Sequence, residues 1–148
     1  MLGLLLAKDY RRLRRHLEWI PLTYRQSLSR ARQPLTFVYF IETGVGSLVN
    51  TMAKTANGQA AEVGTIGNEG MVGLPLLLGD DRAPTSVYVQ VPGRGLRMPA
   101  TRFQSELAAS QSMQSVMLRY AHALFNQVAQ SARATTSIPS SSAAAAGC

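Results

Sequence analysis

The sequence is poor in cysteine and histidine: its 148 residues include one cysteine, Cys148, and two histidines, His16 and His122. A single cysteine excludes an internal disulfide and a cysteine-ligated iron–sulfur cluster. Two histidines are too few for a histidine-rich metal site. A haem with His122 as its one axial ligand is disfavoured, because a lone helical histidine is more often a surface residue and no second ligand lies nearby. We therefore expect no metal.

Motifs of catalysis and of membrane insertion are also missing from the sequence. It has no nucleophile elbow, no P-loop lysine and no clustered pair of carboxylates, so we expect no enzymatic activity. The apolar run at residues 1–7 is too short to span a bilayer and lacks a preceding basic segment and a cleavage site. These features predict a cytoplasmic protein. A length of 148 residues with 46% hydrophobic content suits one domain.

Negative charge is scarce, since 15 Lys and Arg residues outnumber 8 Asp and Glu residues and leave a net charge of +7. Between residues 6 and 20, apolar side chains recur at helical spacing, and the remaining surface holds five cations: Lys8, Arg11, Arg12, Arg14 and Arg15. This pattern predicts a basic amphipathic helix. Attachment to an anionic membrane or to nucleic acid is one interpretation. We favour an apolar stripe in the core with solvated arginines, and we rank nonspecific nucleic-acid binding last.

Short strands are predicted in the middle of the chain. Residues 37–41 read Phe-Val-Tyr-Phe-Ile, Gly44 and Gly46 interrupt this run, and it resumes over residues 47–53, which indicates two paired strands. The Asn57-Gly58 pair suits a type I′ hairpin turn. A further strand is then expected over residues 61–66.

The segment at residues 63–91 has strand-like ends around a glycine-spaced loop, a short apolar helix and a turn. Gly67, Gly70 and Gly73 permit tight turns and close backbone approach. The apolar run Leu74–Leu78 predicts a short helix whose free N–H groups point back at the loop and favour an anion. A glycine triplet alone is usually only a turn, so the order of the surrounding elements matters more.

This order of elements resembles the phosphate-binding cassette of the cyclic nucleotide-binding domain in the cAMP-receptor-protein/fumarate-nitrate-regulator (Crp/Fnr) superfamily of transcriptional regulators. Residues 40–49 also resemble the family's early barrel hairpin, and the resemblance covers roughly residues 1–131. It implies a mainly β fold, a cyclic nucleotide-binding-like double-stranded β-helix or eight-stranded jelly roll. The expected parts are an N-terminal helix at 1–20, the jelly roll at 21–110, a dimerisation helix at 111–131 and a disordered Ser/Ala-rich tail at 132–148.

The resemblance also implies a ligand-binding cassette, whose effector would be a cyclic nucleotide or another small anion. Its expected residues are Gly67, Gly70, Met71, Val72, Gly73, Leu74, Arg82, Pro84, Thr85, Ser86 and Ser131, the last of them beside the nucleotide base. The family places a ribose-binding glutamate directly after the glycine at position 73, where this sequence has Leu74. It places a phosphate-binding arginine where this sequence has Pro84, and Thr85 matches its hydroxyl position.

These two replacements predict a degenerate phosphate site. Each lost contact costs about 1.5–3 kcal/mol, which argues against ordinary cAMP binding. Arg82 could swing into the pocket, although Asp80 and Asp81 compete for its charge. Three accounts stay open: a less polar ligand, an empty pocket, or capture of another anion by the backbone of residues 67–73. A pocket-facing Glu69 would repel phosphate, and we favour a solvent-facing one.

Two helices are predicted towards the C-terminus, at residues 100–108 and 112–131. The second has an apolar stripe at three- and four-residue spacing, wide enough to face both the barrel and a second copy of the chain. The resemblance identifies it as the dimerisation helix, with an expected interface of Met113, Val116, Met117, Tyr120, Leu124 and Val128.

After residue 131 the sequence becomes low in complexity, and Pro139 is expected to stop any helix. No helix-turn-helix pattern follows, so we expect a truncated or frame-shifted regulator. The predicted function is effector sensing and homodimerisation in a Crp/Fnr-like regulator, with DNA reached only through an absent domain or a full-length partner, and without a membrane. The alternative is a ligand-independent interaction protein that forms mixed dimers with full-length regulators.

Overall fold

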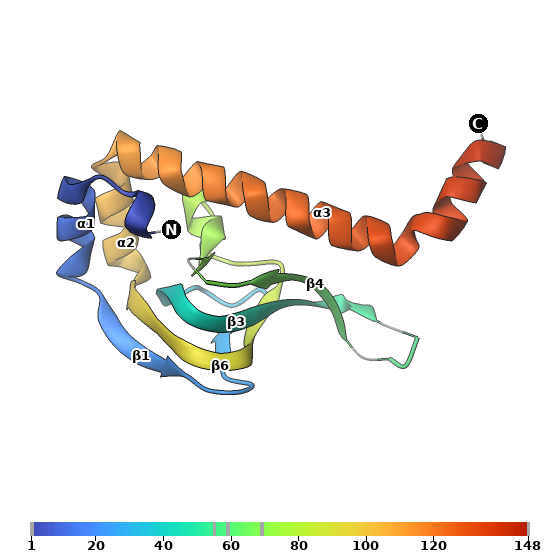
Figure 1. Ribbon diagram of the computed structural model, residues 1–148, viewed down its shortest axis with the longest axis horizontal. Helices are drawn as coiled ribbons and strands as arrows, with labels where there is room; N and C mark the ends of the chain where they lie inside the picture. The colour runs from blue at the N-terminus through green and yellow to red at the C-terminus, as the bar shows by residue number, and fades with distance from the viewer. Residues whose placement is uncertain (1, 55, 59, 69, 148) are drawn as a thin grey trace.

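The computed structural model describes residues 2–54, 56–58, 60–68 and 70–147, with side chains for all of these except Leu4, 51–54 and 131–147. In chain order the elements are a 3-10 helix η1 (Leu2–Leu4), α1 (Ala7–Arg14), β1 (Glu18–Leu22), β2 (Ser27–Ser29), β3 (Phe37–Lys54), β4 (Ala60–Ile66), β5 (Met71–Val72), a second 3-10 helix η2 (Leu74–Leu78), β6 (Ser86–Pro99), α2 (Ala100–Ala108) and α3 (Gln111–Gly147). The mainly β fold with a helix at each end is confirmed (Figure 1).

Two long antiparallel strands, β3 and β6, form the centre of the sheet. They pair from Phe37 opposite Pro99 to Val49 opposite Ser86, and the full strand order is β1-β6-β3-β4, with β2 on β6 and β5 on β3. The described residues contain six strands rather than eight, and the expected break at Gly44 is a bend inside β3. There Gly44 takes a φ of +102°, and the register with β6 shifts. The prediction of two separate strands is therefore wrong.

The hairpin between β3 and β4 is confirmed. The strands pair antiparallel, and their last pair is Lys54 with Ala60. The connection therefore spans residues 55–59, longer than the two-residue turn that Asn57-Gly58 suggested. Gly58 nevertheless takes the positive φ, +79°, that a turn glycine accommodates without strain.

Alternation along the sheet produces two apolar cores, because successive side chains of a strand point to opposite faces. Val38 and Phe40 of β3 pack under the helices in the first core. Tyr39 and Ile41 face the interior of the bent sheet, where they meet Val87 and the rest of the second core. Both cores exclude water from the sheet, so β3 is buried on its two faces over residues 38–41.

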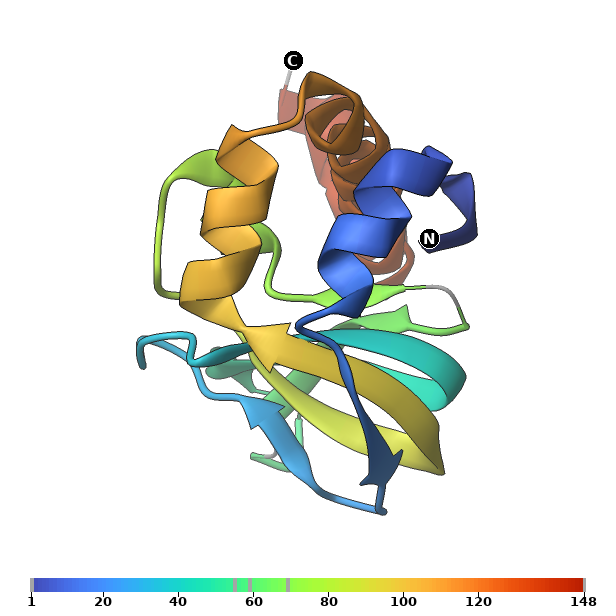
Figure 2. The same cartoon turned by 90° about the vertical axis from the view of Figure 1, so that its left-hand side faces the viewer.

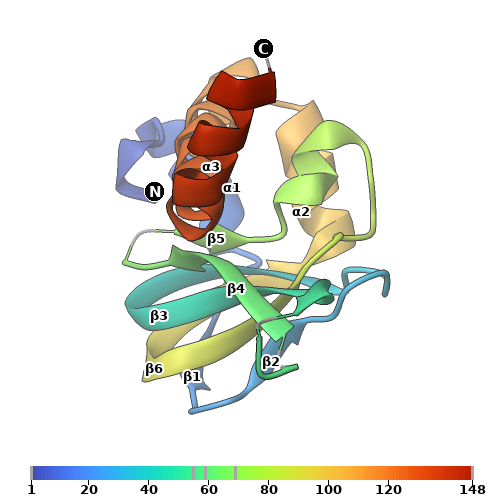
Figure 3. The same cartoon turned by 90° about the vertical axis from the view of Figure 1, so that its right-hand side faces the viewer.

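The helices lie together over one face of the sheet (Figures 2 and 3). Helix α1 ends at Arg14, whereas the sequence predicted a helix to residue 20. Trp19 and Ile20 instead belong to β1 and pair with Leu96 and Gly95. Pro21 disfavours helical backbone in Ile20, the residue before it, and the extended segment pairs with β6.

Helix α3 crosses the helical layer and continues past residue 131 to Gly147, so Pro139 lies within it (Figure 1). The expectation that Pro139 ends the helix is wrong. A proline inside a helix removes one backbone hydrogen bond and bends the axis, and Figure 1 shows α3 bent towards its far end. Among the described residues, no helix combines the length and apolarity that crossing a bilayer requires.

The apolar stripe of α3 faces this chain's own barrel. Met113 and Met117 are 1% and 0% exposed inside the first core, so neither is available to a second copy. Val116 and Tyr120 pack against the same core, and Leu124 against the second one. The sixth member, Val128, lies against the position of Gly64 in β4. The outward face of α3 instead exposes Leu118 and Phe125.

Candidate ligand-binding site

A cavity of about 170 Å³ lies between the sheet interior, η2, the segment before β6, and α3. Its walls are almost entirely apolar, and Ser29 and Thr85 supply the hydroxyl groups. The remaining lining residues are Leu35, Leu48, Ile66, Met71, Val72, Gly73, Leu74, Pro75, Ala83, Pro84, Val87 and Leu124. Such walls favour an apolar ligand with one or two hydrogen-bonding groups.

Six of the residues predicted for the cassette line this cavity: Met71, Val72, Gly73, Leu74, Pro84 and Thr85. Gly73 connects β5 to η2 with a φ of +122°, and a Cβ there would approach Val38 to 3.1 Å. A side chain at position 73 would therefore strain the backbone and press into the core. The glycine thus lets the chain turn tightly from the sheet into the cavity wall.

Gly67 and Gly70 shape the loop without lining the cavity. The N–H of Gly70 donates to the Gly67 carbonyl at 3.0 Å, and the Gly70 carbonyl accepts from Ile41 N–H at 2.9 Å. A Cβ at Gly70 would lie 2.8 Å from the Tyr120 hydroxyl oxygen and 2.5 Å from Ile66. Gly70 is therefore the position where α3 lies directly on the loop. Glu69 lies outside the described residues.

Arg82 points away from the cavity. Its guanidinium donates to the Arg32 carbonyl at 2.8 Å and lies 3.8 Å from the Asp81 carboxylate, and its backbone N–H donates to Asp80 at 3.1 Å. The expectation that Arg82 could replace the family's phosphate-binding arginine therefore finds no contact in the structure. Its neighbour Ser86 is also engaged elsewhere, because its hydroxyl oxygen accepts from Ala31 N–H at 2.9 Å.

The start of η2 offers fewer hydrogen-bond donors than the sequence suggested. Pro75 has no N–H, and the N–H of Leu76 donates to the Gly73 carbonyl at 3.2 Å. The element is a five-residue 3-10 helix rather than an α-helix. The residues that line the cavity, Leu74 and Pro84 among them, include no charged side chain.

A family model for the cyclic nucleotide-binding domain matches residues 22–110, which is more than half of the chain. The chain belongs to the cyclic nucleotide-binding domain family. Comparison with curated protein sequences gives no match. The cavity lies in the part of the fold where this domain's cassette was predicted, so the match and the geometry agree.

Solved structures share the fold of this cyclic nucleotide-binding domain at low sequence identity. One is a domain from Methylobacillus flagellatus, with a TM-score of 0.65 and 14% identity over 82% of this chain and 68% of that one. The sensor domain of the transcriptional regulator DNR from Pseudomonas aeruginosa has a TM-score of 0.58 and 10% identity, over 91% and 83%.

A third similar structure is the regulatory subunit of a cAMP-independent protein kinase A from Trypanosoma cruzi bound to guanosine, with a TM-score of 0.65 and 16% identity over 81% of this chain. The match spans about two fifths, 41%, of that subunit. At these identities the comparisons establish the fold alone.

In this domain α3 covers the cavity through Leu124. One turn earlier Tyr120 is partly buried beside the cassette, and burial raises its pKa above 10.0 while a hydrogen bond with the Met71 backbone acts in the opposite direction.

The side chain of Ser131, predicted beside a nucleotide base, is not among the described ones. Ser29 and Leu35 were missed, because they come from a segment for which no element was predicted. The described residues contain no cluster of His, Cys, Asp and Glu that could hold a metal ion.

Proposed function

We propose that this cyclic nucleotide-binding domain is the effector-sensing and dimerisation part of a Crp/Fnr-type transcriptional regulator, and that its cavity takes a small, largely apolar molecule. The observation that carries this proposal is the wall chemistry: Leu74 and Pro84 line the cavity, and the resemblance to the family places them where a ribose acceptor and a phosphate-binding cation would be. Burying a cyclic phosphate without a partner would cost several kcal/mol.

The size of the cavity supports the same conclusion. Pockets for drug-sized ligands usually measure about 300–1,000 Å³, whereas an apolar cavity of about 150 Å³ holds a benzene-sized molecule. The volume here, about 170 Å³, is close to the second case. The hydroxyl groups of Ser29 and Thr85 would orient such a ligand by one or two hydrogen bonds.

Helix α3 is the element whose position would change when a ligand fills the cavity. Leu124 lines the cavity, and Tyr120 lies on the loop at Gly70 and Met71. Suppose that α3 can take two positions. A ligand that binds more tightly to one of them raises the population of that position, by an amount set by the difference in affinity. Sensing therefore requires that the ligand contacts Leu124 more favourably in one position of α3 than in the other.

The outward face of α3 is the surface we assign to homodimerisation. Leu118 and Phe125 are 49% and 69% exposed and lie seven residues apart, on one side of the helix. Two copies that pair along this face would cover both side chains. DNA contact would then come from a helix-turn-helix unit, which the described residues do not contain.

A binding screen tests the proposal. The purified protein is titrated calorimetrically with cAMP, cGMP, guanosine, indole and benzoate, and each titration is repeated with Leu124→Phe, which narrows the cavity, and with Arg82→Ala. We expect saturable binding of a small aromatic probe that Leu124→Phe weakens and Arg82→Ala leaves unchanged.

Tight cAMP binding that Arg82→Ala abolishes would overturn the proposed ligand chemistry. If the protein binds none of the probes yet forms a stable dimer, the ligand-independent interaction protein becomes the better account.

A further inference from the structure

A second recess lies where α1 leads into β1; Figure 2 shows the path of the chain through this junction. It measures about 450 Å³ and is lined by Tyr10, Arg14, Leu17, Trp19 and Leu96, which we call the α1–β1 groove. None of these residues lines the cassette cavity. Four of the five precede the span that the family model matches.

The groove exposes aromatic rings to an unusual degree. Trp19, the only tryptophan of the chain, is 59% exposed, and Tyr10 is 36% exposed. Tyr24, two residues beyond the end of β1, is 61% exposed. Large aromatic side chains are normally well buried because of their apolar area. The exposed rings of Tyr10 and Trp19 in one recess therefore indicate a surface that binds something flat or apolar.

Arginines accompany these rings. The guanidinium carbon of Arg94 lies 5.3 Å from the centre of the Trp19 ring, and that of Arg25 lies 5.3 Å from the centre of the Tyr24 ring. The register explains the first pair: Trp19 is opposite Leu96, and Arg94 is two residues away on the same face of β6. Each pair presents a positive charge beside an aromatic face.

The surrounding carboxylates are already engaged. Asp9 is buried and accepts hydrogen bonds from Ser110 and Ser112. Glu18 pairs with Arg97, and Glu106 pairs with Arg12 at 2.7 Å.

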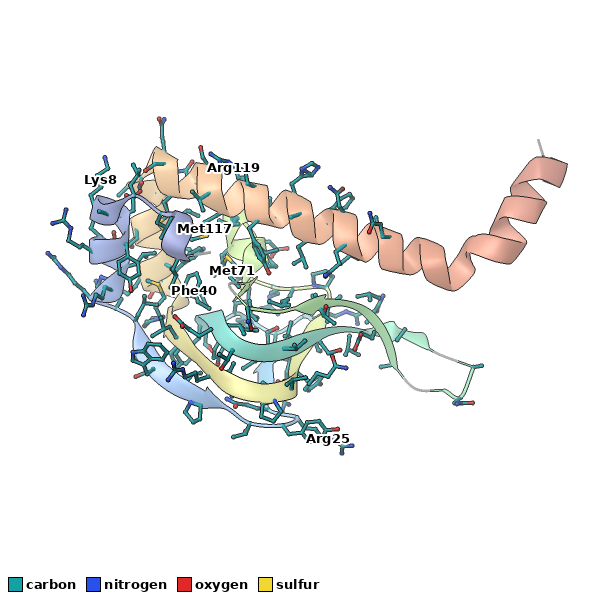
Figure 4. The ribbon with its side chains drawn as sticks, in the orientation of Figure 1. Lys8, Arg25, Phe40, Met71, Met117 and Arg119 are labelled. Atoms are coloured by element: carbon teal, nitrogen blue, oxygen red, sulfur yellow. The ribbon has the colours of Figure 1, made fainter. Side chains whose placement is uncertain are left out.

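Six further cations on and around α1 and β1 have no carboxylate within ion-pair distance among the described residues: Lys8, Arg11, Arg14, Arg15, Arg25 and Arg94. Figure 4 labels two of them, Lys8 on α1 and Arg25 beyond the end of β1.

We propose that the α1–β1 groove binds single-stranded nucleic acid, with bases stacked on Trp19 and Tyr10 and phosphates held by Arg14 and its neighbouring arginines. Exposed aromatic rings on a positively charged track are the combination that single-stranded nucleic acid requires, because each base presents a π face and each linkage a phosphate. Duplex bases are stacked on each other and leave their faces covered. An anionic bilayer would favour rings that protrude, whereas Tyr10 and Trp19 form the walls of a recess.

The lone tryptophan makes the test direct, since Trp19 reports on its own site. Its emission is followed while the full chain is titrated with dT or rU oligomers of about 12 nucleotides, a length in the range of known single-strand sites. We expect saturable quenching by both oligomers. The affinity should fall roughly 20- to 50-fold between about 50 and 200 mM salt if three or four phosphates are neutralised.

Variants separate stacking from general charge attraction, with binding followed by the anisotropy of a labelled oligomer. Trp19→Leu should weaken binding roughly 5- to 150-fold, the loss that corresponds to one stacked base, while Trp19→Phe retains most of the affinity. Arg14→Ala should weaken binding more than Arg119→Ala, which removes the same charge from the exposed outer side of α3 (Figure 4). Melting curves confirm that each variant is folded.

Three results would overturn the proposal. One is equal affinity of Trp19→Leu and the parent protein, and another is an equal loss in the two arginine variants, because either indicates diffuse attraction by net charge. The third is quenching of Trp19 by vesicles of phosphatidylglycerol and phosphatidylcholine in the absence of quenching by either oligomer. None of these readouts depends on the ligand of the cassette cavity.

Discussion

The Ser110 hydroxyl donates a hydrogen bond of 2.8 Å to Oδ1 of Asp9, which lies 101 positions earlier in the chain. Ser112 donates to the other carboxylate oxygen at 2.5 Å, and the Ser110 oxygen accepts from the backbone N–H of Met113 at 3.2 Å. Asp9 is thus a buried anion at the start of α3, where free N–H groups favour negative charge. The contact ties α1 to the junction of α2 and α3.

Removing this charge should destabilise the protein. We expect Asp9→Asn to lower the free energy of unfolding at neutral pH by about 1–3 kcal/mol, because buried hydroxyl donors lose a charged acceptor. Urea denaturation followed by circular dichroism measures the change. Asp81→Asn is the matched control, since the Asp81 side chain is 66% exposed, and it should change stability by less than about 0.5 kcal/mol.

The same contact predicts a pH dependence. The hydrogen bond from Ser112 lowers the pKa of Asp9 below 3.8, with burial acting against it. A carboxylate with a lowered pKa stabilises the fold fully above its unfolded-state value, and that stabilisation is lost as the pH falls through the folded-state pKa. The stability difference between the parent and Asp9→Asn should therefore shrink in acid below pH 3.8. A difference that stays constant there would contradict the assignment.

Truncation of two neighbouring residues of α3 should lower the stability by very different amounts. Met117 is 0% exposed in the first core, so Met117→Ala should cost about 2–5 kcal/mol of stability. Leu118 is 49% exposed, so Leu118→Ala should cost less than about 0.5 kcal/mol in a monomer. Thermal unfolding at low protein concentration measures the loss of stability in each variant. Similar losses in both variants would mean that α3 is rotated about its axis relative to this structure.

Tyr120 should titrate at a higher pH than an ordinary tyrosine. Burial raises its pKa above 10.0, so the neutral phenol is favoured in the folded state, and the stabilisation is lost as the pH rises past that value. Ultraviolet titration should lose a phase above pH 10.0 in Tyr120→Phe. Loss of a phase near the ordinary pKa would show that α3 does not lie on the Gly70–Met71 loop in solution.

Introducing the two polar groups should strengthen nucleotide binding, although a nucleotide is larger than the present cavity of about 170 Å³. Leu74→Glu with Pro84→Arg places an acceptor and a cation in the cavity wall, and each charge-assisted contact should strengthen cAMP binding roughly 10- to 150-fold. Calorimetry measures the gain. Leu78→Glu with Gln33→Arg adds the same charges outside the cavity and should have no effect. A folded double variant without any gain would mean that the cavity shape, rather than its polarity, excludes the nucleotide.

Dimerisation should depend on the outward side chain of α3. Light scattering of the parent should give about twice the 16.0 kDa chain mass, and Phe125→Glu should give monomers, because a buried carboxylate at an apolar interface lacks a partner. Gln130→Glu introduces the same charge on the same helix and should leave the dimer intact. A monomeric parent protein would remove this assignment.

The sequence by itself determined several local elements and, by resemblance, the family. Alternation at residues 37–41 predicted a strand, the apolar run Leu74–Leu78 predicted a short helix, and the order of elements around the glycines located a cassette, six of whose residues line one cavity. The resemblance to the family also placed Leu74 and Pro84 at positions where a nucleotide would need polar groups. These conclusions hold because turn glycines, side-chain periodicity and residue type act over a few neighbouring residues.

Only the tertiary structure decided which partner each surface meets. The stripe of α3 was read correctly as apolar, but packing over the sheet assigned Met113 and Met117 to this chain's own core. Pro21 and pairing with β6 changed the end of the predicted first helix into β1. Arg82 turned to the Arg32 carbonyl, 50 residues away, rather than into the cavity. Such contacts join residues distant in sequence, and their energies depend on the folded arrangement rather than on local pattern.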